Sequence, residues 1–484
     1  MKQIRKLQNW SRQKLADRPI LQNVLVLFTG TAAAQAFAMA AALITARLFT
    51  PEAFGQFAIY GAITGVIITI ANLRYDMTIV LPETDDEARM IARLAMRANI
   101  VISLLTVVAA LALRGVVIDI WGSEELAFWL PVGGLTVFLS AAVAIMQYWF
   151  NRKVDYKTIS INRFQQTAGS SGGEVLFGAF GLRSMAGLLW GVLLGQIWAF
   201  GNLWRKSKSL RQPVASNTPS MWEMAKRYKK MPLLNLPNAL IDAVRLNGIV
   251  LLIGTIALGA VGQFNLAWQS MQVPIGLING AISQVFFERL ARVERGNMRP
   301  LVRATIKRAF LLGLPPFIII YIIAPWIFTF VFGPQWNMVG DIARALTPWL
   351  ALMLVSSPVS TVFVVTFKQH WMLIFSIFFM IFPLGWLYFS PLSLIPTLTV
   401  LGWLMAGMLI INLFLADLAA SRYDQEAPAE QTESALNAEV ENRQAELAAG
   451  ELSGIYESPA ADIPAAEQID NIDTPGAAES KKEE

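Results

Sequence analysis

Arg47-Leu48-Phe49-Thr50-Pro51-Glu52-Ala53-Phe54-Gly55-Gln56-Phe57 is a short polar hinge between two long apolar runs, which cover residues 23–49 and 56–72. Each run has roughly the 20 residues that an α-helix needs to cross the hydrocarbon core of a bilayer. Pro51 cannot continue a helix from the run before it, and Gly55 allows the backbone more conformations where the next run begins. The stretch from Arg47 to Gln56 therefore predicts a tight turn at one membrane face.

The composition extends this interpretation to the whole chain. The 484 residues are 55% hydrophobic and only 15% charged, whereas soluble proteins carry about 25% charged residues. Ten further apolar runs follow the first two, at residues 98–118, 126–150, 160–181, 184–204, 232–256, 260–286, 309–332, 340–366, 371–389 and 393–418. We predict an all-α polytopic membrane protein with about 12 transmembrane helices.

Several classes of site are excluded by what the sequence lacks. The absence of cysteine excludes disulfide frameworks, thiolate metal sites and cysteine nucleophiles. The chain has no Gly-rich phosphate loop, no metal-ligand cluster and no nucleophile at motif spacing from a base. We therefore expect neither an enzyme nor a cofactor, and no binding of nucleic acid.

The distribution of positive charge predicts the orientation in the membrane. With the N-terminus inside, the cytoplasmic segments hold 30 Lys and Arg, whereas the external connections hold only Arg47, Arg114, Arg183 and Arg344. Positive charge marks the cytoplasmic side. Both termini are therefore expected in the cytoplasm, with the first apolar run kept as a membrane helix rather than removed as a signal peptide.

The chain divides into five parts by composition. We expect a basic cytoplasmic N-terminus (1–22), an N-terminal lobe of six helices (23–204), a cytoplasmic linker (205–231), a C-terminal lobe of six helices (232–420) and a tail (421–484). The tail carries 16 acidic and 4 basic residues, so it is predicted to be a disordered acidic appendage. The basic linker serves topology and contact with anionic membrane lipids.

Short echoes in the sequence suggest that the two lobes are repeats. Gly262-Gln263-Phe264 repeats Gly55-Gln56-Phe57 at a spacing of 207 residues, and Phe332-Gly333 corresponds to Trp121-Gly122 at a spacing of 211. Because six helices is an even number, both halves enter the membrane in the same orientation. The expected architecture is a parallel pseudo-repeat, as in one class of secondary transporters, although a chance echo of short motifs is the alternative.

Two neighbouring apolar runs carry continuous polar faces. Asn235, Asn238, Asp242 and Arg245 are spaced by 3, 4 and 3 residues, and Asn265, Gln269, Gln272, Gly276, Asn279 and Ser283 by 4, 3, 4, 3 and 4. Polar side chains in a membrane tend to face a hydrated cavity. They can also join helices by hydrogen bonds, and Asp242 can simply neutralise Arg245. We favour a hydrated cavity wall.

Glu174 is an ionisable side chain inside the fifth apolar run, in Gly169-Ser170-Ser171-Gly172-Gly173-Glu174. At that depth a carboxylate, like Asp242, could couple transport to a proton or sodium gradient. It could equally bond serine hydroxyls on a closely packed glycine-rich helix.

Several motifs follow one another along the chain: Arg47-x-x-Thr50-Pro51-Glu52-x-x-Gly55, Arg74-Tyr75-Asp76 with Leu81-Pro82, Tyr148-Trp149-Phe150-Asn151-Arg152 followed by Tyr156-Lys157 and Arg163, and Phe332-Gly333-Pro334-x-Trp336. In this order they resemble the motifs of Wzx-type lipid-linked oligosaccharide flippases. Met231-Pro232 departs from the pattern, since relatives often carry an aromatic residue before the proline. The acidic tail lies outside the resemblance.

This resemblance implies the fold of the multidrug, oligosaccharidyl-lipid and polysaccharide exporter superfamily, with two six-helix lobes around a central cavity. It also implies a bacterial inner-membrane protein that turns undecaprenyl-pyrophosphate-linked oligosaccharides toward the periplasm for O-antigen or exopolysaccharide synthesis, alongside other polysaccharide assembly proteins. Arginine suits pyrophosphate because its planar fork donates two parallel hydrogen bonds. Arg245 is the most membrane-central candidate, followed by Arg47, Arg74 and Arg163, while the Asn and Gln side chains would face sugar hydroxyls.

Three other functions stay open at this point. A multidrug or cation antiporter of the same superfamily would favour a cavity dominated by carboxylates, whereas the central candidate here is Arg245 beside Asp242. A membrane polysaccharide polymerase or ligase often displays a large external loop, and all external connections here are short. A scaffold that recruits partners through the acidic tail is the third.

Overall fold

The computed structural model describes residues 19–291, 293, 296–366 and 368–425, and within these ranges it contains helices and no β-strand. The long helices are α2 (Pro19–Leu48), α3 (Pro51–Ala71), α4 (Asp85–Ala112), α7 (Gly133–Arg152), α8 (Tyr156–Ala179), α9 (Met185–Lys206), α11 (Leu236–Gly254), α12 (Leu258–Ala291), α13 (Met298–Phe332), α14 (Val339–Val359), α16 (Gln369–Phe389) and α17 (Leu394–Gln425). Shorter elements connect them: η1 (Met77–Val80), α5 (Arg114–Trp121), α6 (Glu124–Trp129), η2 (Leu130–Val132), η3 (Ser209–Arg211), α10 (Met221–Arg227), η4 (Met231–Asn235), η5 (Pro334–Trp336) and α15 (Val362–Val365).

Each predicted apolar run overlaps one of the long helices, and the runs 98–118, 126–150, 232–256 and 340–366 also extend into shorter elements beside it. Ten helical segments of the described chain are long and apolar enough to cross a membrane. The helix α8 is not among them and carries polar residues that the sequence singled out. The helix α12 was searched only in part, because many of its residues lie outside the described side chains. The membrane protein class is confirmed, whereas the count of twelve spans stays a prediction.

The predicted hinge is shorter in the structure than in the sequence. The helix α2 ends at Leu48 and α3 begins at Pro51, so only Phe49 and Thr50 lie between them. The hydroxyl of Thr50 accepts the Ala53 N–H at 3.3 Å and caps the new helix. Pro51 occupies the first turn, where no backbone donor is needed. The prediction of a turn as far as Gln56 was therefore too long.

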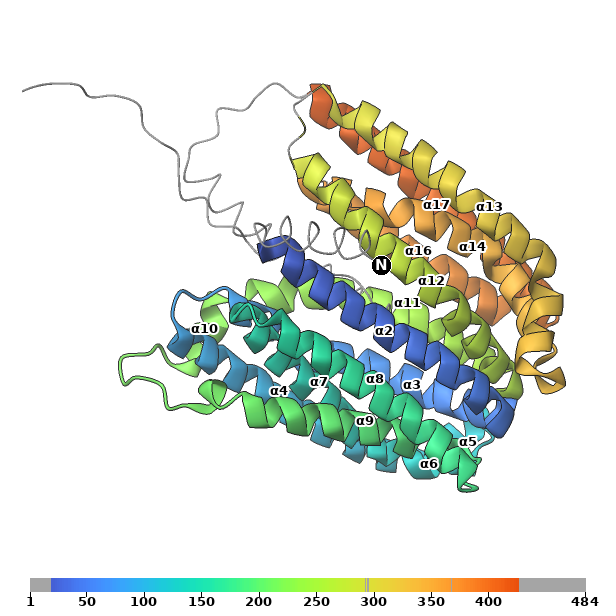
Figure 1. The fold of residues 1–484 in the computed structure, drawn as a ribbon, viewed down its shortest axis with the longest axis horizontal. Coiled ribbons are helices and arrows are strands. Elements are labelled where there is room, and N and C mark those ends of the chain that lie inside the picture. The colour runs from blue at the N-terminus through green and yellow to red at the C-terminus, as the bar shows by residue number, and fades with distance from the viewer. Residues whose placement is uncertain (1–18, 292, 294–295, 367, 426–484) are drawn as a thin grey trace, which may run out of the picture.

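The helices pack in two groups, which we call the N-lobe (α2–α9) and the C-lobe (α11–α17). In the N-lobe α8 packs against α2 and α9, and α4 packs against α7; in the C-lobe α14 packs against α13 and α17, and α16 against α11. Between the lobes, α3 packs against both α11 and α12. Figure 1 shows the two groups spreading apart toward the left of the view. The two-lobe fold is confirmed, while the proposed boundaries of lobes and linker stay predictions.

The two copies of the repeated tripeptide meet each other between the lobes. A Cβ atom added at Gly55 would lie 1.8 Å from the carbonyl oxygen of Leu258, and one at Gly262 would lie 1.9 Å from the carbonyl oxygen of Pro51. Only glycine permits such a backbone approach, as small residues do where membrane helices cross closely. The first turns of α3 and α12 thus cross in direct contact.

The residues that follow these glycines make corresponding contacts in each lobe. The amide of Gln56 donates to the Ser123 hydroxyl at 2.9 Å, and Gln263 accepts the Met338 N–H at 2.7 Å. Each glutamine therefore holds the connection before the fourth helix of its own lobe. Gly122 and Gly333, which precede these connections, have φ angles of 64° and 102°. These paired contacts match the predicted parallel repeat.

Two tryptophans reach across the interface in opposite directions. The Trp336 ring N–H donates to the carbonyl oxygen of Ala46 at the end of α2, at 2.6 Å, and the Trp121 ring N–H donates to that of Leu251 near the end of α11, at 3.4 Å. The sequence aligned Trp121 with Phe332, but the residue with the corresponding contact is Trp336. We call these two bonds and the crossing of Gly55 with Gly262 the external junction, because the predicted orientation puts this end of the helices outside.

The apolar core is shared at the external junction and divided away from it. One buried cluster contains residues of both lobes, including Phe54, Ile59, Ile253 and Phe264. At the other end of the helices each lobe has a cluster of its own: Tyr75, Ile79 and Trp149 in the N-lobe, and Met298, Phe363 and Ala420 in the C-lobe. The lobes are therefore joined by apolar packing chiefly at one membrane face.

The linker contains a short helix, and α17 extends past the predicted start of the tail. Part of the linker forms α10, which begins with a capping box between Ser220 and Glu223. The helix α17 continues to Gln425, beyond the predicted start of the tail at Ser421. Its Asp424 carboxylate accepts the N–H groups of Gly296, Met298 and Arg299 at the start of α13, which explains the extension. Residues 426–484 lie outside the described chain.

We expect Gly262→Ala to destabilise the protein, because the new methyl group would collide with the Pro51 carbonyl oxygen. Overpacking of this kind costs about 1–3 kcal/mol. Thermal unfolding of the purified protein measures it. Gly61→Ala in α3 is the matched control, since no atom lies within 4 Å of its Cβ position. Equal unfolding temperatures for both variants would contradict the close approach.

Candidate substrate-binding site

The polar face of α11 begins at an irregular helical turn. Residues Met231–Asn235 form a π-helical turn, η4, where Pro232 and the nearby Pro237 each remove a backbone donor. Asn238 on the following turn is exposed, and the Asp242 side chain is 40% exposed. These two side chains therefore present polar groups on a face of α11 that its neighbours leave open.

Arg245 lies one turn beyond Asp242 and is held from two sides. Its guanidinium approaches the Asp242 carboxylate at 3.4 Å and lies over the Phe379 ring of α16, 4.6 Å from the ring centre. The side chain is only 11% exposed, and its Nε is buried with no hydrogen-bond partner in the described chain. A guanidinium has five N–H donors. One long contact with a half-exposed carboxylate leaves most of them available to an anionic oxygen.

The polar residues of α12 separate into two environments. Gln269 is exposed, and its amide reaches Asn265 at 3.4 Å. Gln272 is buried against α14, where its amide meets the Met353 sulfur at 3.8 Å and its Oε1 has no partner among the described residues. The side chains of Asn279 and Ser283 lie outside the part that the structure describes. Of the predicted polar face of α12, only Asn265 and Gln269 are accessible among the side chains that the structure describes.

The other candidate arginines are not gathered around Arg245. Arg47 is exposed in the last turn of α2, and Arg74 lies just beyond the opposite end of α3. A 21-residue helix is about 30 Å long, so Arg47 and Arg74 cannot hold one phosphate group together. Arg163 is half-buried in the second turn of α8. A pyrophosphate at Arg245 would therefore not be shared by all four arginines.

Arg74 belongs instead to a buried polar cluster at the end of α3. Leu73 and Arg74 have φ angles of 49° and 61°, a costly conformation for residues with a Cβ. Asn72, Arg74 and Asp76 are all buried, and each keeps one polar atom without a partner in the described chain. Burial raises the pKa of the Asp76 carboxyl, against the opposing effect of the Arg74 charge. The Arg74-Tyr75-Asp76 motif was the sequence signal of this cluster.

Glu174 lies where α8 and α9 pack most closely. A Cβ at Gly173 would lie 2.9 Å from the Cα of Gly191, and one at Gly191 would lie 2.7 Å from the Cγ of Glu174. The Ser170 hydroxyl donates to the Val192 carbonyl oxygen rather than to this carboxylate. No described residue forms a hydrogen bond or ion pair with Glu174. The predicted alternative, a bond to serine hydroxyls, is therefore absent among the described residues.

Comparison with known proteins supports the fold and the family. Residues 44–340 match the family described as "Polysaccharide biosynthesis protein". The structure is similar to the lipid II flippase MurJ in an inward closed conformation, with a TM-score of 0.64, 12% identity, and coverage of 89% of this chain and 98% of that one. It is also similar to an inward-facing multidrug resistance MATE family transporter of the MOP superfamily, with a TM-score of 0.60, 16% identity, and coverage of 81% and 96%.

An outward-facing MATE family transporter gives a TM-score of 0.53 at 16% identity, covering 84% of this chain and 97% of that one. No curated protein sequence matches the chain. At these identities the solved structures show a shared fold alone, and the predicted fold of two helical lobes is confirmed. The roles of the candidate site residues stay predictions.

The stacking of Arg245 on Phe379 leads to a quantitative expectation. In a double-mutant cycle of Arg245→Gln and Phe379→Leu, we expect a coupling free energy of about 0.5–2 kcal/mol from the cation–π contact. Chemical or thermal unfolding of the four proteins measures it. Phe378→Leu, at an exposed neighbouring position of α16, should show no coupling to Arg245→Gln. Additive effects in the first cycle would mean that the ring does not hold the guanidinium.

Proposed function

Because the chain belongs to the polysaccharide biosynthesis protein family, we propose that it is a flippase for lipid-linked oligosaccharides. Its substrate would be an oligosaccharide repeat unit joined through pyrophosphate to undecaprenol, turned from the cytoplasmic to the periplasmic leaflet of the bacterial inner membrane. The main support for the proposal is Arg245, a cation within a membrane helix. Most of its N–H donors form no hydrogen bond with the described residues. Its helix presents Asn238 and Asp242 on the same accessible face.

Phosphate recognition follows from the chemistry of this residue. The energetic cost of placing a cation in a membrane is high, so a retained cation usually faces an ion or substrate pathway. Phe379 supports the flat guanidinium, and Asp242 orients it from one edge. A pyrophosphate would accept charge-assisted hydrogen bonds from the N–H groups that Asp242 leaves unused. Asn238, Asn265 and Gln269 would then meet sugar hydroxyls, while the lipid chain stays in the bilayer.

The two lobes are joined chiefly at one membrane face, and movement of the substrate to that side would require them to separate there. The positive-charge count assigns the junction to the external face, so the described conformation would be open toward the cytoplasm. To open outward, the protein would have to separate Gly55 from Gly262 and break both tryptophan hydrogen bonds. The separate apolar clusters of the N-lobe and C-lobe would then approach each other at the cytoplasmic face.

An antiporter of the same superfamily is the second candidate. The similarity to multidrug resistance transporters and the unpartnered Glu174 carboxylate favour it. Glu174 would serve the same role in a flippase or an antiporter, because protonation or sodium binding at this carboxylate would couple transport to an ion gradient. Asp242 is less suited to coupling because it already faces Arg245.

Deletion of the gene should leave lipid-linked repeat units on the cytoplasmic leaflet and reduce surface polysaccharide. We expect Arg245→Ala to fail to complement, because loss of charge-assisted bonds to phosphate costs roughly tenfold or more in affinity. Extraction of lipid-linked intermediates and their accessibility to periplasmic enzymes provide the measurement. Arg114→Ala, which removes an exposed arginine remote from the site, should complement fully. Normal surface polysaccharide in the deletion strain, with drug sensitivity instead, would refute the flippase proposal.

A disulfide across the external junction should stop transport. The chain contains no cysteine, and a Cβ at Gly259 would lie 3.9 Å from the Cγ of Glu52. We expect the pair Glu52→Cys and Gly259→Cys to lose transport on oxidation and to recover it with a reductant, since the linked lobes cannot open outward. Each single cysteine variant is the control. Unchanged transport by the fully cross-linked protein would exclude the proposed opening.

A further inference from the structure

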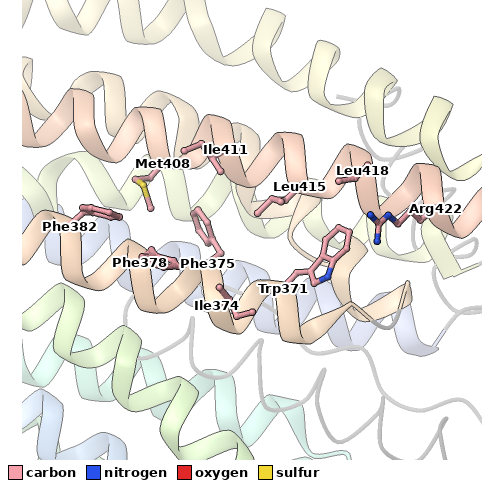
Figure 2. Close-up of a pocket in the computed structure, with 10 residues that line it drawn as sticks. All are labelled: Trp371, Ile374, Phe375, Phe378, Phe382, Met408, Ile411, Leu415, Leu418 and Arg422. Carbon is pink, nitrogen blue, oxygen red and sulfur yellow. The ribbon is translucent and has the colours of Figure 1, made fainter.

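An apolar groove runs along the outer side of the C-lobe between α16 and α17. Its volume is ≈ 540 Å³, and its walls come from Phe375, Phe378 and Phe382 on α16 and from Met408, Ile411 and Leu415 on α17. Trp371 and Arg422 stand at one end of the groove (Figure 2). Several wall residues are exposed, Phe378 and Ile411 among them. The groove is therefore open sideways to the bilayer.

The groove has the depth of one membrane leaflet. Trp371 and Phe382 mark its two ends on α16, and eleven residues of helix rise about 16 Å. Half of a hydrocarbon core of about 30 Å is roughly 15 Å. Tryptophan is enriched at the interface between membrane and water. The end with Trp371 and Arg422 therefore lies at a membrane surface, which the charge count assigns to the cytoplasm, and the other end lies near the bilayer centre.

The acidic side chains of the described chain near Arg422 are engaged elsewhere. Asp417 forms ion pairs with Arg299 and Arg303 of α13, and Asp424 accepts three backbone N–H groups at the start of α13. Both carboxylates thus serve the contact between α17 and α13. Arg422 points the other way, with its guanidinium 4.9 Å from the centre of the Trp371 ring. No described residue pairs with its charge, so its N–H groups remain available at the mouth of the groove.

We propose that this groove binds an anionic phospholipid of the cytoplasmic leaflet. One acyl chain would lie against the phenylalanines, and the phosphate would accept hydrogen bonds from Arg422. The match of depth to a single leaflet favours a phospholipid, because a polyprenyl chain is much longer than the groove between Trp371 and Phe382. Arg245 does not line the groove, although the groove residue Phe375 stacks on Phe379 with ring centres 5.2 Å apart. The proposal does not depend on the identity of the transported substrate.

Native mass spectrometry of the purified full-length protein tests the proposal. The protein is titrated with phosphatidylglycerol and, separately, with phosphatidylcholine of the same chains. We expect preferential retention of phosphatidylglycerol, weakened about tenfold by Arg422→Gln because charge-assisted bonds are lost. Ile411→Trp fills the groove and should lower retention with Arg422 intact. Lys307→Gln, which removes an exposed charge of α13 outside the groove, should change nothing.

Three results would overturn the proposal. One is equal retention of phosphatidylglycerol by the protein with and without Arg422→Gln. Another is equal retention of the two phospholipids. The third is undecaprenyl phosphate displacing phosphatidylglycerol at equal concentration, with no displacement in Ile411→Trp, since the groove would then hold a polyprenyl chain. Binding is measured without transport, so failure of the flippase proposal would leave this result unaffected.

Discussion

The crossing of α3 and α12 at Gly55 and Gly262 is the contact on which the arrangement of the two lobes depends. Carbonyl oxygens of the facing helix occupy the space where a Cβ would be at both positions. This approach brings the ends of α2 and α11 within reach of tryptophans from the opposite lobe. Apolar packing alone would hold the lobes loosely in a membrane, because lipid chains are as apolar as the side chains. Backbone contact and two directed hydrogen bonds define one geometry instead.

A junction at one membrane face leaves the helices free to diverge toward the other. The separate apolar clusters of the N-lobe and the C-lobe at that other face are consistent with two bodies that move as units. The accessible polar face of α11 belongs to the helix that also contacts α3 across the interface. Charged and polar groups are tolerated there because they have partners or open space, as Arg245 has in Asp242 and Phe379. The proposed transport site and the proposed movement thus involve the same helix.

Protein neighbours also explain how α8 and α12 accommodate their polar side chains. The helix α8 is flanked by α2 and α9, and α12 is flanked by α3 and α14. Glutamine, asparagine and glutamate are costly against lipid but tolerable against protein. The surface of the C-lobe shows the opposite case, since the groove between α16 and α17 is apolar along one leaflet and cationic only at its mouth. In these helices, the faces that contact protein carry polar side chains, and the face that is open to lipid is apolar.

The sequence by itself determined the class of the protein, the number and order of its apolar runs, the internal repeat and the polar face of α11. These features are periodic or compositional, and the membrane forces each apolar run to be helical because backbone groups must be satisfied within the segment. Only the tertiary structure decided that the two Gly-Gln-Phe sequences contact each other and that Trp336 rather than Phe332 corresponds to Trp121. It also placed Gln272 in the protein interior and Gln269 at the surface, although the sequence predicted both on one polar face of α12. Such pairings depend on how helices rotate and cross, and contacts between residues some two hundred positions apart leave no local pattern in the chain.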